Sequence, residues 1–459
     1  GVSADVAMRV YSARLLGKVR QLVLHGGGNV SVKTKMSDVL GKAEDVICVK
    51  GSGWDMEYIE PPGLPAVRLN PIQELSGLKS LSDEDMVNVQ RSNLLDSSSP
   101  NPSVETLLHA FLPQKFVDHT HANSVLALTD LAEGDSICSE LYGKRAVVVP
   151  YIMPGFSLAK KASEVYRDNP NCEGLILLRH GIFSFGETAR ESYERMIALV
   201  SLAEDRLKVG TGKIERVAIP KALARPTEIA PILRGKCAPM RANGKHRDII
   251  LTYRTDSSIK AYVDGKELSR YSQVGPVTPD HVIRTKPKPL IVPAPEVGKL
   301  SAWVTEVDKR LASYQSEYGA YFDRQNNDLE KAKTPLDPMP RVILVRGLGL
   351  FGLGNSMRAA SIAADLAETT ISVVSASERL GKFQSILESD IFDVEYWSLE
   401  QAKLGKFKAP VFEGHVVAVT GGAGTIGLAT ANAFREKGAE VALLDVDHKE
   451  VMAAATLIG

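Results

Sequence analysis

The residues best suited to chemistry are three histidines between positions 119 and 180. His119 and His121 lie two apart at the end of a strand predicted over Lys115–Thr120, and side chains two apart on a strand point the same way. His180 follows an apolar strand predicted over Leu175–Leu178, so its side chain can project from the strand end. Three imidazoles that leave a fourth position open are typical of catalytic zinc. We therefore expect these three histidines to bind one zinc ion.

A carboxylate suited to proton transfer comes just before the histidine pair. Val104–Leu112 predicts a helix in which Glu105 and His109 lie four apart on one face. Zinc with an open position polarises a substrate oxygen, and a neighbouring carboxylate moves the proton, so we expect Glu105 to be the acid/base. An HxH pair alone is more often structural, but the helix before it and the His-Gly after it favour a metal. The remaining histidines lack such neighbours: His25, His246, His281, His415 and His448.

Two glycine-rich turns predict an anion site near this metal. One is LHGGGNVSV at 24–32, and the other is VKGSGW at 49–54, where Lys50 adds a positive charge. Glycines expose backbone N–H groups, and such turns can hold a phosphate or carboxylate. Either turn alone is more often an ordinary loop, but together with a serine before Glu105 they indicate one site. The predicted phosphate ligands are Gly28, Asn29, Gly51, Ser52 and Ser103.

A nucleotide-binding pattern lies near the C-terminal end. An apolar strand from Val416 leads into GGAGTIG and a helix, and the next strand, Glu440–Leu444, ends at an acid. This context favours a dinucleotide site, with the pyrophosphate on the helix N-terminus and the acid on the ribose of NAD rather than NADP. The predicted NAD-binding residues are Gly421, Gly422, Gly424, Thr425, Ile426, Gly427 and Asp445.

Two further motifs have weaker interpretations. Gly347-x-Gly349-x-x-Gly352 also follows a strand, but the strand predicted next, Thr370–Ser375, has no acid at its end. We therefore interpret this glycine motif as a structural βαβ unit that uses glycine for a tight turn and close packing. The segment GPVTPDHVIRTK at 275–286 either closes over the metal site or caps a helix, and the sequence favours neither.

Composition excludes several classes of function. The chain has 459 residues, and 55 basic and 55 acidic side chains give no net charge, which argues against blanket binding to nucleic acid. No apolar run reaches the ~18 residues of a membrane span, and no signal peptide is found. The four cysteines form no CxxC motif, so we expect a reduced, cytoplasmic protein without disulfides. Both ends look cut, and we find no internal repeat.

The fold expected is α/β, in four segments. Residues 1–215 mix strands and helices around the candidate metal site, and 216–333 extend this domain with strands near Asp248–Tyr253 and Ala261–Val263 and a helical region over 299–333. Residues 341–400 predict a connecting βαβ subdomain, and 411–459 predict the start of a Rossmann domain.

Several of these strings resemble a known family. GNVSV, KGSG, the Glu-x-x-x-His helix, HTH and the strand-end HG follow the order seen in class II aldolases, whose fold the adducin head shares. LHGGGN, VKGSGWD, NPSVETLLHAFLP, FVDHTHA and GPVTPDH resemble bifunctional class II aldolase/short-chain dehydrogenases of the rhamnulose-1-phosphate aldolase/lactaldehyde dehydrogenase type. TGGAGTIG likewise resembles short-chain dehydrogenases. Their Ser and Tyr-x-x-x-Lys would come later than residue 459, so we expect a truncated, inactive dehydrogenase and an incomplete NAD site.

The resemblance implies a reaction in rhamnose catabolism. Zinc on the three histidines would bind the two oxygens of a ketose 1-phosphate, and Glu105 would shuttle a proton during cleavage to dihydroxyacetone phosphate and L-lactaldehyde. Val104 departs from the family, which usually has a second serine there, and Lys50 would compensate for the lost hydrogen bond. Tyr151 lies near the region of the family's proton-donating tyrosine but does not align with it. The resemblance also implies a homo-oligomer, a tetramer.

Three other interpretations stay open. One is an NAD-dependent sugar or polyol dehydrogenase whose aldolase-like half is structural. Another is an adducin-like interaction module without chemistry, against which the complete histidine set argues. The third is an epimerase of the ribulose-5-phosphate type, which uses the same zinc site.

Overall fold

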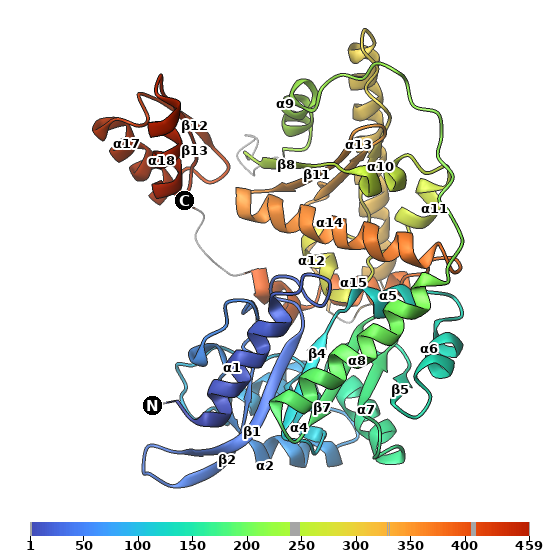
Figure 1. Cartoon of the computed structure of the whole chain (residues 1–459), viewed down its shortest axis with the longest axis vertical. Coiled ribbons are helices and arrows are strands. Elements are labelled where there is room, and N and C mark those ends of the chain that lie inside the picture. The colour runs from blue at the N-terminus through green and yellow to red at the C-terminus, as the bar shows by residue number, and fades with distance from the viewer. Residues whose placement is uncertain (1, 239–247, 328, 330, 405–409, 459) are drawn as a thin grey trace. The chain divides into compact units, whose positions relative to one another are not determined.

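The computed structural model describes residues 2–238, 248–327, 329, 331–404 and 410–458 (Figure 1). His246 lies outside these ranges. The chain divides into two compact units, and each is described here by itself. Unit 1 comprises Gly1–Ile214, Val274–Ile283 and Ser372–Leu404, and unit 2 comprises Glu215–Gln273, Arg284–Ile371 and Gly405–Gly459.

Unit 1 is built on a seven-stranded sheet in the order β3-β2-β1-β4-β7-β6-β5. Every neighbouring pair is antiparallel except β5 with β6. The strands are β1 (Asn29–Ser37), β2 (Ala43–Val49), β3 (Ala66–Arg68), β4 (Phe116–Thr120), β5 (Ala146–Val149), β6 (Gly174–Leu177) and β7 (Gly181–Gly186). The predicted α/β fold with a largely antiparallel central sheet is confirmed here.

Helices cover both faces of this sheet, because its strands are apolar on both sides. One face packs against α1 (Ala4–Gly17), α5 (Asn123–Thr129), α6 (Gly134–Tyr142) and α8 (Ala189–Lys208). The other packs against α2 (Leu69–Glu74), α3 (Asp83–Ser92), α4 (Thr106–Phe111) and α7 (Phe156–Asp168). The rest of unit 1 is short helices: η1 (Pro61–Gly63), η2 (Leu75–Gly77), η3 (Pro279–His281), α15 (Glu388–Glu395), α16 (Ser398–Gln401) and η4 (Ala402–Leu404).

Strand β4 shows how the two faces position the site. Phe116 joins the core beneath α1 and α8, and the next residue, Val117, joins the core beneath α4 and α7. His119 follows two residues after Val117 and stacks on Phe183, which belongs to the same core. The period of two along a strand therefore directs His119 to the α4 face.

Unit 2 contains a four-stranded sheet in the order β8-β11-β10-β9. Its strands are β8 (Ile250–Arg254), β9 (Leu290–Val292), β10 (Val342–Val345) and β11 (Gly349–Gly354). The helices are α9 (Pro226–Lys236), α10 (Ser257–Val263), α11 (Leu268–Ser272), α12 (Val282–Thr285), α13 (Leu300–Asn326) and α14 (Met357–Ser377); the boundaries between the units fall inside α12 and α14. The segments predicted separately as 216–333 and 341–400 thus contribute to one sheet.

Three sequence-based predictions in this region are wrong. Ala261–Val263 lies in α10 and Thr370–Ser375 in α14, so neither is a strand. The glycines at 347–352 join β10 to the antiparallel β11 and form no βαβ turn. Their structural role is nevertheless evident: Gly347 has φ 79°, and a Cβ on Gly352 would lie 2.4 Å from the carbonyl oxygen of Ala360 in α14.

The two sheets contain an internal repeat that we did not find in the sequence. The order β8-β11-β10-β9, with antiparallel, antiparallel and parallel pairs, is the order and direction of β4-β7-β6-β5 in unit 1. The helices agree as well: α10 and α11 correspond to α5 and α6, α13 to α7, and α14 to α8. Unit 2 therefore repeats half of the unit 1 fold.

The remaining sheet is the parallel pair β12 (Val416–Thr420) and β13 (Glu440–Leu444), with α17 (Thr425–Glu436) between them and α18 (His448–Ile458) after them. These elements lie where the sequence predicts them. That they begin a Rossmann dehydrogenase domain stays a prediction.

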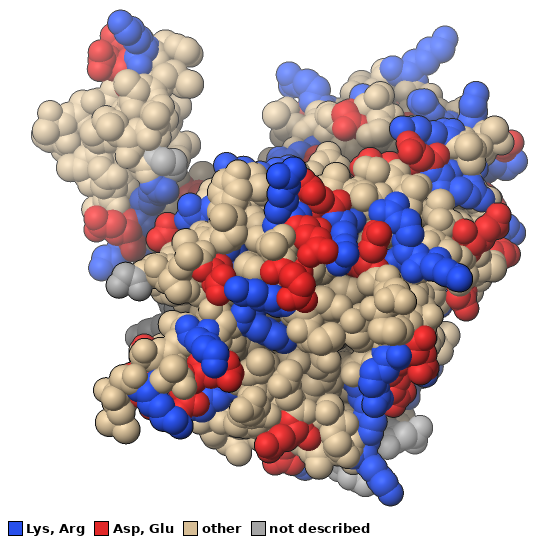
Figure 2. All heavy atoms as spheres, turned by 60° about the horizontal axis from the view of Figure 1, so that its bottom comes forward, with Lys and Arg blue, Asp and Glu red and all other residues tan. Residues whose placement is uncertain are grey.

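Other sequence predictions can be compared with the structure directly. All four cysteines are free and buried. No helix in the described ranges is long and apolar enough to cross a membrane. Basic and acidic side chains are interspersed on the face in Figure 2, in keeping with zero net charge.

Candidate metal centre

Three buried histidines converge in unit 1, as the sequence predicts. His119 lies on β4, His121 follows the strand, and His180 lies in the turn from β6 to β7. Their nearest nitrogens all lie within 4.8 Å of one another. The approach requires glycine next to His180, because a Cβ on Gly181 would lie 2.5 Å from the carbonyl oxygen of Thr120. This explains the His-Gly pair in the sequence.

The nitrogen positions suit a tetrahedral zinc ion. Nε2 of His119 and Nε2 of His121 are 3.1 Å apart, close to the ~3.3 Å between ligands on a zinc with bonds of about 2.0 Å. His119 Nδ1 lies 3.1 Å from the carbonyl oxygen of Ile182, and His121 Nδ1 lies 3.4 Å from Asp280 Oδ1. These partners can hold the Nδ1–H tautomers, which leaves each Nε2 lone pair for a metal.

The protonation states also fit a metal. Burial lowers the pKa of His119 to about 4 and that of His121 to about 3, although Glu105 and Asp280 oppose these shifts. Both rings are therefore neutral at pH 7, which is the form that binds a metal ion.

Glu105 faces the histidines from the residue that precedes α4. Its Oε2 lies 3.4 Å from His119 Nε2, and its Oε1 lies 3.5 Å from His180 Nε2. Asn29 Nδ2 donates a hydrogen bond of 2.6 Å to Oε2. Burial alone would raise the pKa of Glu105, but the charges of His119 and His180 and the bond from Asn29 bring it to about 2. Glu105 is thus a carboxylate at the open side of the histidine set.

His109 lies away from the metal and holds Asn29. The helix was expected to begin at Val104, but α4 begins at Thr106, and Glu105 is its N-cap residue. His109 Nε2 contacts Asn29 Oδ1, and its Nδ1 lies 2.9 Å from Ser31 Oγ. Because the Asn29 amide group donates to Glu105, its oxygen must accept from His109. A chain of hydrogen bonds therefore fixes the Glu105 carboxylate.

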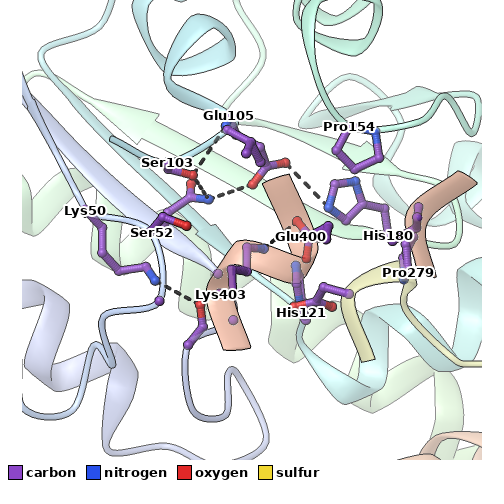
Figure 3. Close-up of a pocket in the computed structure, with 18 residues that line it drawn as sticks. Lys50, Ser52, Ser103, Glu105, His121, Pro154, His180, Pro279, Glu400 and Lys403 are labelled. Carbon is purple, nitrogen blue, oxygen red and sulfur yellow. Dashed lines mark hydrogen bonds and ion pairs between the residues drawn. The ribbon is translucent and has the colours of Figure 1, made fainter. Parts of the chain in front are cut away.

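The predicted phosphate ligands meet in one pocket with one exception. Gly28, Asn29, Ser52 and Ser103 line a pocket together with Glu105, His121 and His180 (Figure 3). Gly51 does not line it; its N–H donates to the carbonyl oxygen of Gly63 and so shapes the turn. Gly28 has φ 57°, and a Cβ there would lie 2.7 Å from the carbonyl oxygen of His119. The glycine turn is thus packed directly against β4, the strand that contains His119.

Lys50 has a different role from the one expected. Its Nζ donates to the carbonyl oxygens of Gly26 at 2.9 Å and Trp54 at 2.7 Å, which ties the two glycine turns together. Burial lowers the pKa of Lys50 to about 7, and the charge of Lys403 adds to this shift. Lys50 therefore organises the turns with two of its three N–H donors, and it also lines the pocket.

The pocket also contains residues that sequence reasoning missed. Asp280, Glu400 and Lys403 line it, from segments that belong to unit 1 although they are far along the chain. The segment at 275–286 does reach the site, but through Asp280 and through Thr278 Oγ1, which donates to the carbonyl oxygen of His180. Tyr151 is not among the residues that line the pocket. No motif marks residues 398–404, so only long-range packing reveals them.

The equivalent positions of the repeat in unit 2 carry no metal ligands. The strand registers pair His119 with Phe183 and Tyr253 with Phe351, so Tyr253 corresponds to His119, Thr255 to His121 and Leu348 to His180. The hydroxyls of Tyr253 and Thr255 both donate to the carbonyl oxygen of Leu348, at 2.9 and 2.6 Å. In unit 2, hydrogen bonds therefore occupy the position where unit 1 has its three imidazoles. Among the described residues, only the three histidines of unit 1 form a group that could hold a metal ion.

Comparison with known proteins identifies these domains. Residues 9–207 match the family model for the class II aldolase and adducin N-terminal domain, and residues 224–404 match that for the class II aldolase second domain. The chain therefore carries two class II aldolase domains. Asp280, Glu400 and Lys403 belong to the second match.

Individual relatives extend the comparison. The chain is 33% identical over 448 residues to the uncharacterized oxidoreductase YuxG of Bacillus subtilis (strain 168), covering 95% of this chain. It spans 64% of the length of that relative. The matches to the aldolase domain models indicate an enzyme at the level of the family.

Solved structures are also similar. The N-terminal class II aldolase domain of a conserved Thermoplasma acidophilum protein is 38% identical, with 45% of this chain and 95% of that chain covered and a TM-score of 0.43. The L-fuculose-1-phosphate aldolase from Thermus thermophilus is 20% identical, with 45% and 100% covered and a TM-score of 0.31.

Proposed function

We propose that the chain is a zinc-dependent aldolase that cleaves a ketose 1-phosphate, with L-rhamnulose 1-phosphate as its substrate. The products would be dihydroxyacetone phosphate and L-lactaldehyde. The observation that carries the proposal is the buried set His119, His121 and His180 facing Glu105 in a pocket that also contains the glycine and serine turns. A metal and a phosphate can be held side by side there.

Each part of the pocket has a role in this reaction. His119, His121 and His180 would hold zinc, which as a Lewis acid stabilises negative charge on substrate oxygens. Gly28, Asn29, Gly51, Ser52 and Ser103 would bind or shape the phosphate site through N–H and hydroxyl donors. Glu105 would transfer the proton at C3 of the dihydroxyacetone phosphate half. Asn29 and His109 would keep its carboxylate aimed at this carbon.

A second activity is proposed for the segment that contains β12 and β13. Gly422 and Gly424 lie between β12 and α17, and Gly427 lies in the first turn of α17, where the pyrophosphate of NAD would bind; Asp445 follows β13. Asp445 Oδ2 accepts from Ala423 N–H at 3.0 Å, so the acid already orders the glycine turn. With a complete dehydrogenase domain, this site would oxidise the aldehyde product. We further propose a cytoplasmic homo-oligomer, a tetramer.

The primary test is release of dihydroxyacetone phosphate. Purified chain incubated with L-rhamnulose 1-phosphate is expected to release it, measured by a coupled glycerol-phosphate dehydrogenase assay. A chelator should abolish the release and added zinc should restore it, because zinc would be the Lewis acid of this reaction. L-Fuculose 1-phosphate and L-ribulose 5-phosphate, run in parallel, distinguish another ketose and an epimerase. A zinc-loaded protein inert on all three would contradict the proposal.

The repeat leads to a separate prediction about metal content. We expect one zinc ion per chain, although the fold motif occurs twice, because Tyr253, Thr255 and Leu348 replace the histidines in unit 2. Inductively coupled plasma mass spectrometry on dialysed protein measures the ratio. His180→Ala should bring it near zero, whereas Thr255→Ala should leave it at one. Two zinc ions per chain, or zinc lost with Thr255→Ala, would show that the second copy binds metal.

A further inference from the structure

The pocket contains a buried carboxylate that none of the aldolase motifs provides. Glu400 lies on α16 and Lys403 on η4, and Figure 3 shows both side chains entering the pocket that Glu105 and His180 also line. The Glu400 side chain is only 3% exposed, and its Oε1 lies 2.5 Å from Lys403 Nζ. Its other oxygen, Oε2, is buried and has no hydrogen-bond partner among the described residues. A buried carboxylate oxygen without a donor is costly, which indicates that a ligand supplies one.

Aldol cleavage requires a second proton-transfer group besides Glu105. The bond between C3 and C4 breaks only if the hydroxyl on C4 loses its proton, since that oxygen becomes the aldehyde oxygen. Glu105 is engaged at C3 on the other side of the breaking bond. A separate base must therefore face the C4 hydroxyl.

The other titratable groups of the pocket are already committed. Asp280 lies 3.4 Å from His121 Nδ1 and orients that ring. Lys50 donates to two backbone carbonyl oxygens. The Glu400–Lys403 pair remains, and within it only Glu400 Oε2 is an acceptor without a donor.

The surroundings give Glu400 a suitable basicity. Burial raises its pKa above the ordinary value, Lys403 opposes this rise, and the charges of Asp280 and Glu105 add to it. Glu400 and Asp280 in turn raise the pKa of Lys403 despite burial, so a positive charge stands beside Glu400.

We propose that Glu400 is the second catalytic residue, the base for the C4 hydroxyl, with Lys403 as its positioning partner; this rests on the proposed aldolase function. Glu400 Oε2 takes the hydroxyl proton, and the O–H electrons form the aldehyde C=O bond. The C3–C4 bond breaks and leaves its electron pair on the dihydroxyacetone phosphate half as the enediolate. Glu105 then relays a proton from water to C3, and Glu400 releases its proton to water, so both groups end as carboxylates.

The test separates the two carboxylates with a partial reaction. Exchange of a C3 hydrogen of dihydroxyacetone phosphate with D₂O, followed by NMR, needs the metal and Glu105 but no C4 hydroxyl. Glu400→Gln is expected to cleave L-rhamnulose 1-phosphate about 10²- to 10⁴-fold more slowly, the usual range for a lost general base, while this exchange continues at the wild-type rate. Zinc content and calorimetric affinity for dihydroxyacetone phosphate should stay unchanged.

Lys403→Met provides a second variant with a different readout. Without the ammonium the pKa of Glu400 rises, so the acid limb of the cleavage profile should move to higher pH. Glu164→Gln and Lys161→Met are the matched controls, because they alter an ion pair of the same i,i+3 spacing on the exposed surface of α7. Neither should change cleavage or its pH profile.

The outcomes distinguish this inference from the proposed function. Wild-type cleavage by Glu400→Gln would overturn the inference and leave the aldolase intact. Loss of exchange together with cleavage would overturn it too, since Glu400 would then act on the whole site. If the zinc-loaded wild type shows neither exchange nor cleavage, the aldolase function itself fails, and the inference fails with it.

Discussion

Replacement of Glu105 with glutamine is expected to slow cleavage about 10²- to 10⁴-fold while zinc remains bound. The carboxylate faces His119 and His180 at 3.4 and 3.5 Å, so it lies where a proton is needed beside the metal. Glutamine keeps the shape and volume of the side chain but cannot accept a proton. The Glu105→Gln substitution should therefore lower the rate of cleavage without lowering the stability of the fold.

Two readouts test the Glu105→Gln prediction. Steady-state cleavage and C3 hydrogen exchange should both be lost, in contrast to Glu400→Gln, which should lose cleavage alone. Zinc content, measured on the same sample, should match wild type because the three imidazoles are untouched. The exposed Glu164→Gln serves as the control for removal of one acidic charge. Cleavage at the wild-type rate would remove Glu105 from the mechanism.

Local patterns were sufficient to predict the centre of this site. The spacing of His119 and His121 follows from strand periodicity, and Gly181 is required by one close backbone approach. Both features can be read from short stretches of sequence. The glycine turns were found for the same reason, since their positive φ angles require glycine locally. The start of α4 was predicted two residues too early, and the contact of His109 with Asn29 was not foreseen.

The residues that complete the pocket could not be found in this way. Glu400 and Lys403 come from a segment with no motif, nearly 300 residues beyond Glu105, and only tertiary packing brings them together. The repeat was not found in the sequence because the two copies share their backbone fold but not their residues. Tyr253 occupies the position equivalent to His119, and Leu348 the position equivalent to His180. The glycines at 347–352 were interpreted as a βαβ turn because that turn and the β10–β11 hairpin both need a tight turn and close helix packing.

A buried ion pair connects the fold to the metal site. Asp118 precedes His119 on β4, and its Oδ1 lies 2.5 Å from Arg9 Nη2 of α1, with both side chains fully buried. Ser192 Oγ of α8 donates to Asp118 Oδ2, and Arg9 Nη2 donates to Ser12 Oγ at 2.8 Å. Two helices are thus joined to the strand that carries the metal ligands.

Arg9→Met is expected to lower the free energy of unfolding of unit 1 by about 3–5 kcal/mol, because it leaves the Asp118 charge buried and unpaired. Urea denaturation in a Trp303→Phe background measures this, since the remaining Trp54 and Trp397 both belong to unit 1. Arg190→Met is the matched control: Arg190 pairs with Glu194 on the exposed side of α8, and its loss should leave the free energy of unfolding nearly unchanged.

A double variant separates the pair from its burial. Arg9→Met with Asp118→Asn removes both charges, so it should recover part of the stability lost by Arg9→Met alone. Zinc affinity should be highest in the wild type, lower in the double variant and lowest in Arg9→Met, because β4 must be held in place for His119 and His121 to meet His180. A loss below about 1 kcal/mol in Arg9→Met would contradict this account, and the strand would then be held by its apolar neighbours rather than by the ion pair.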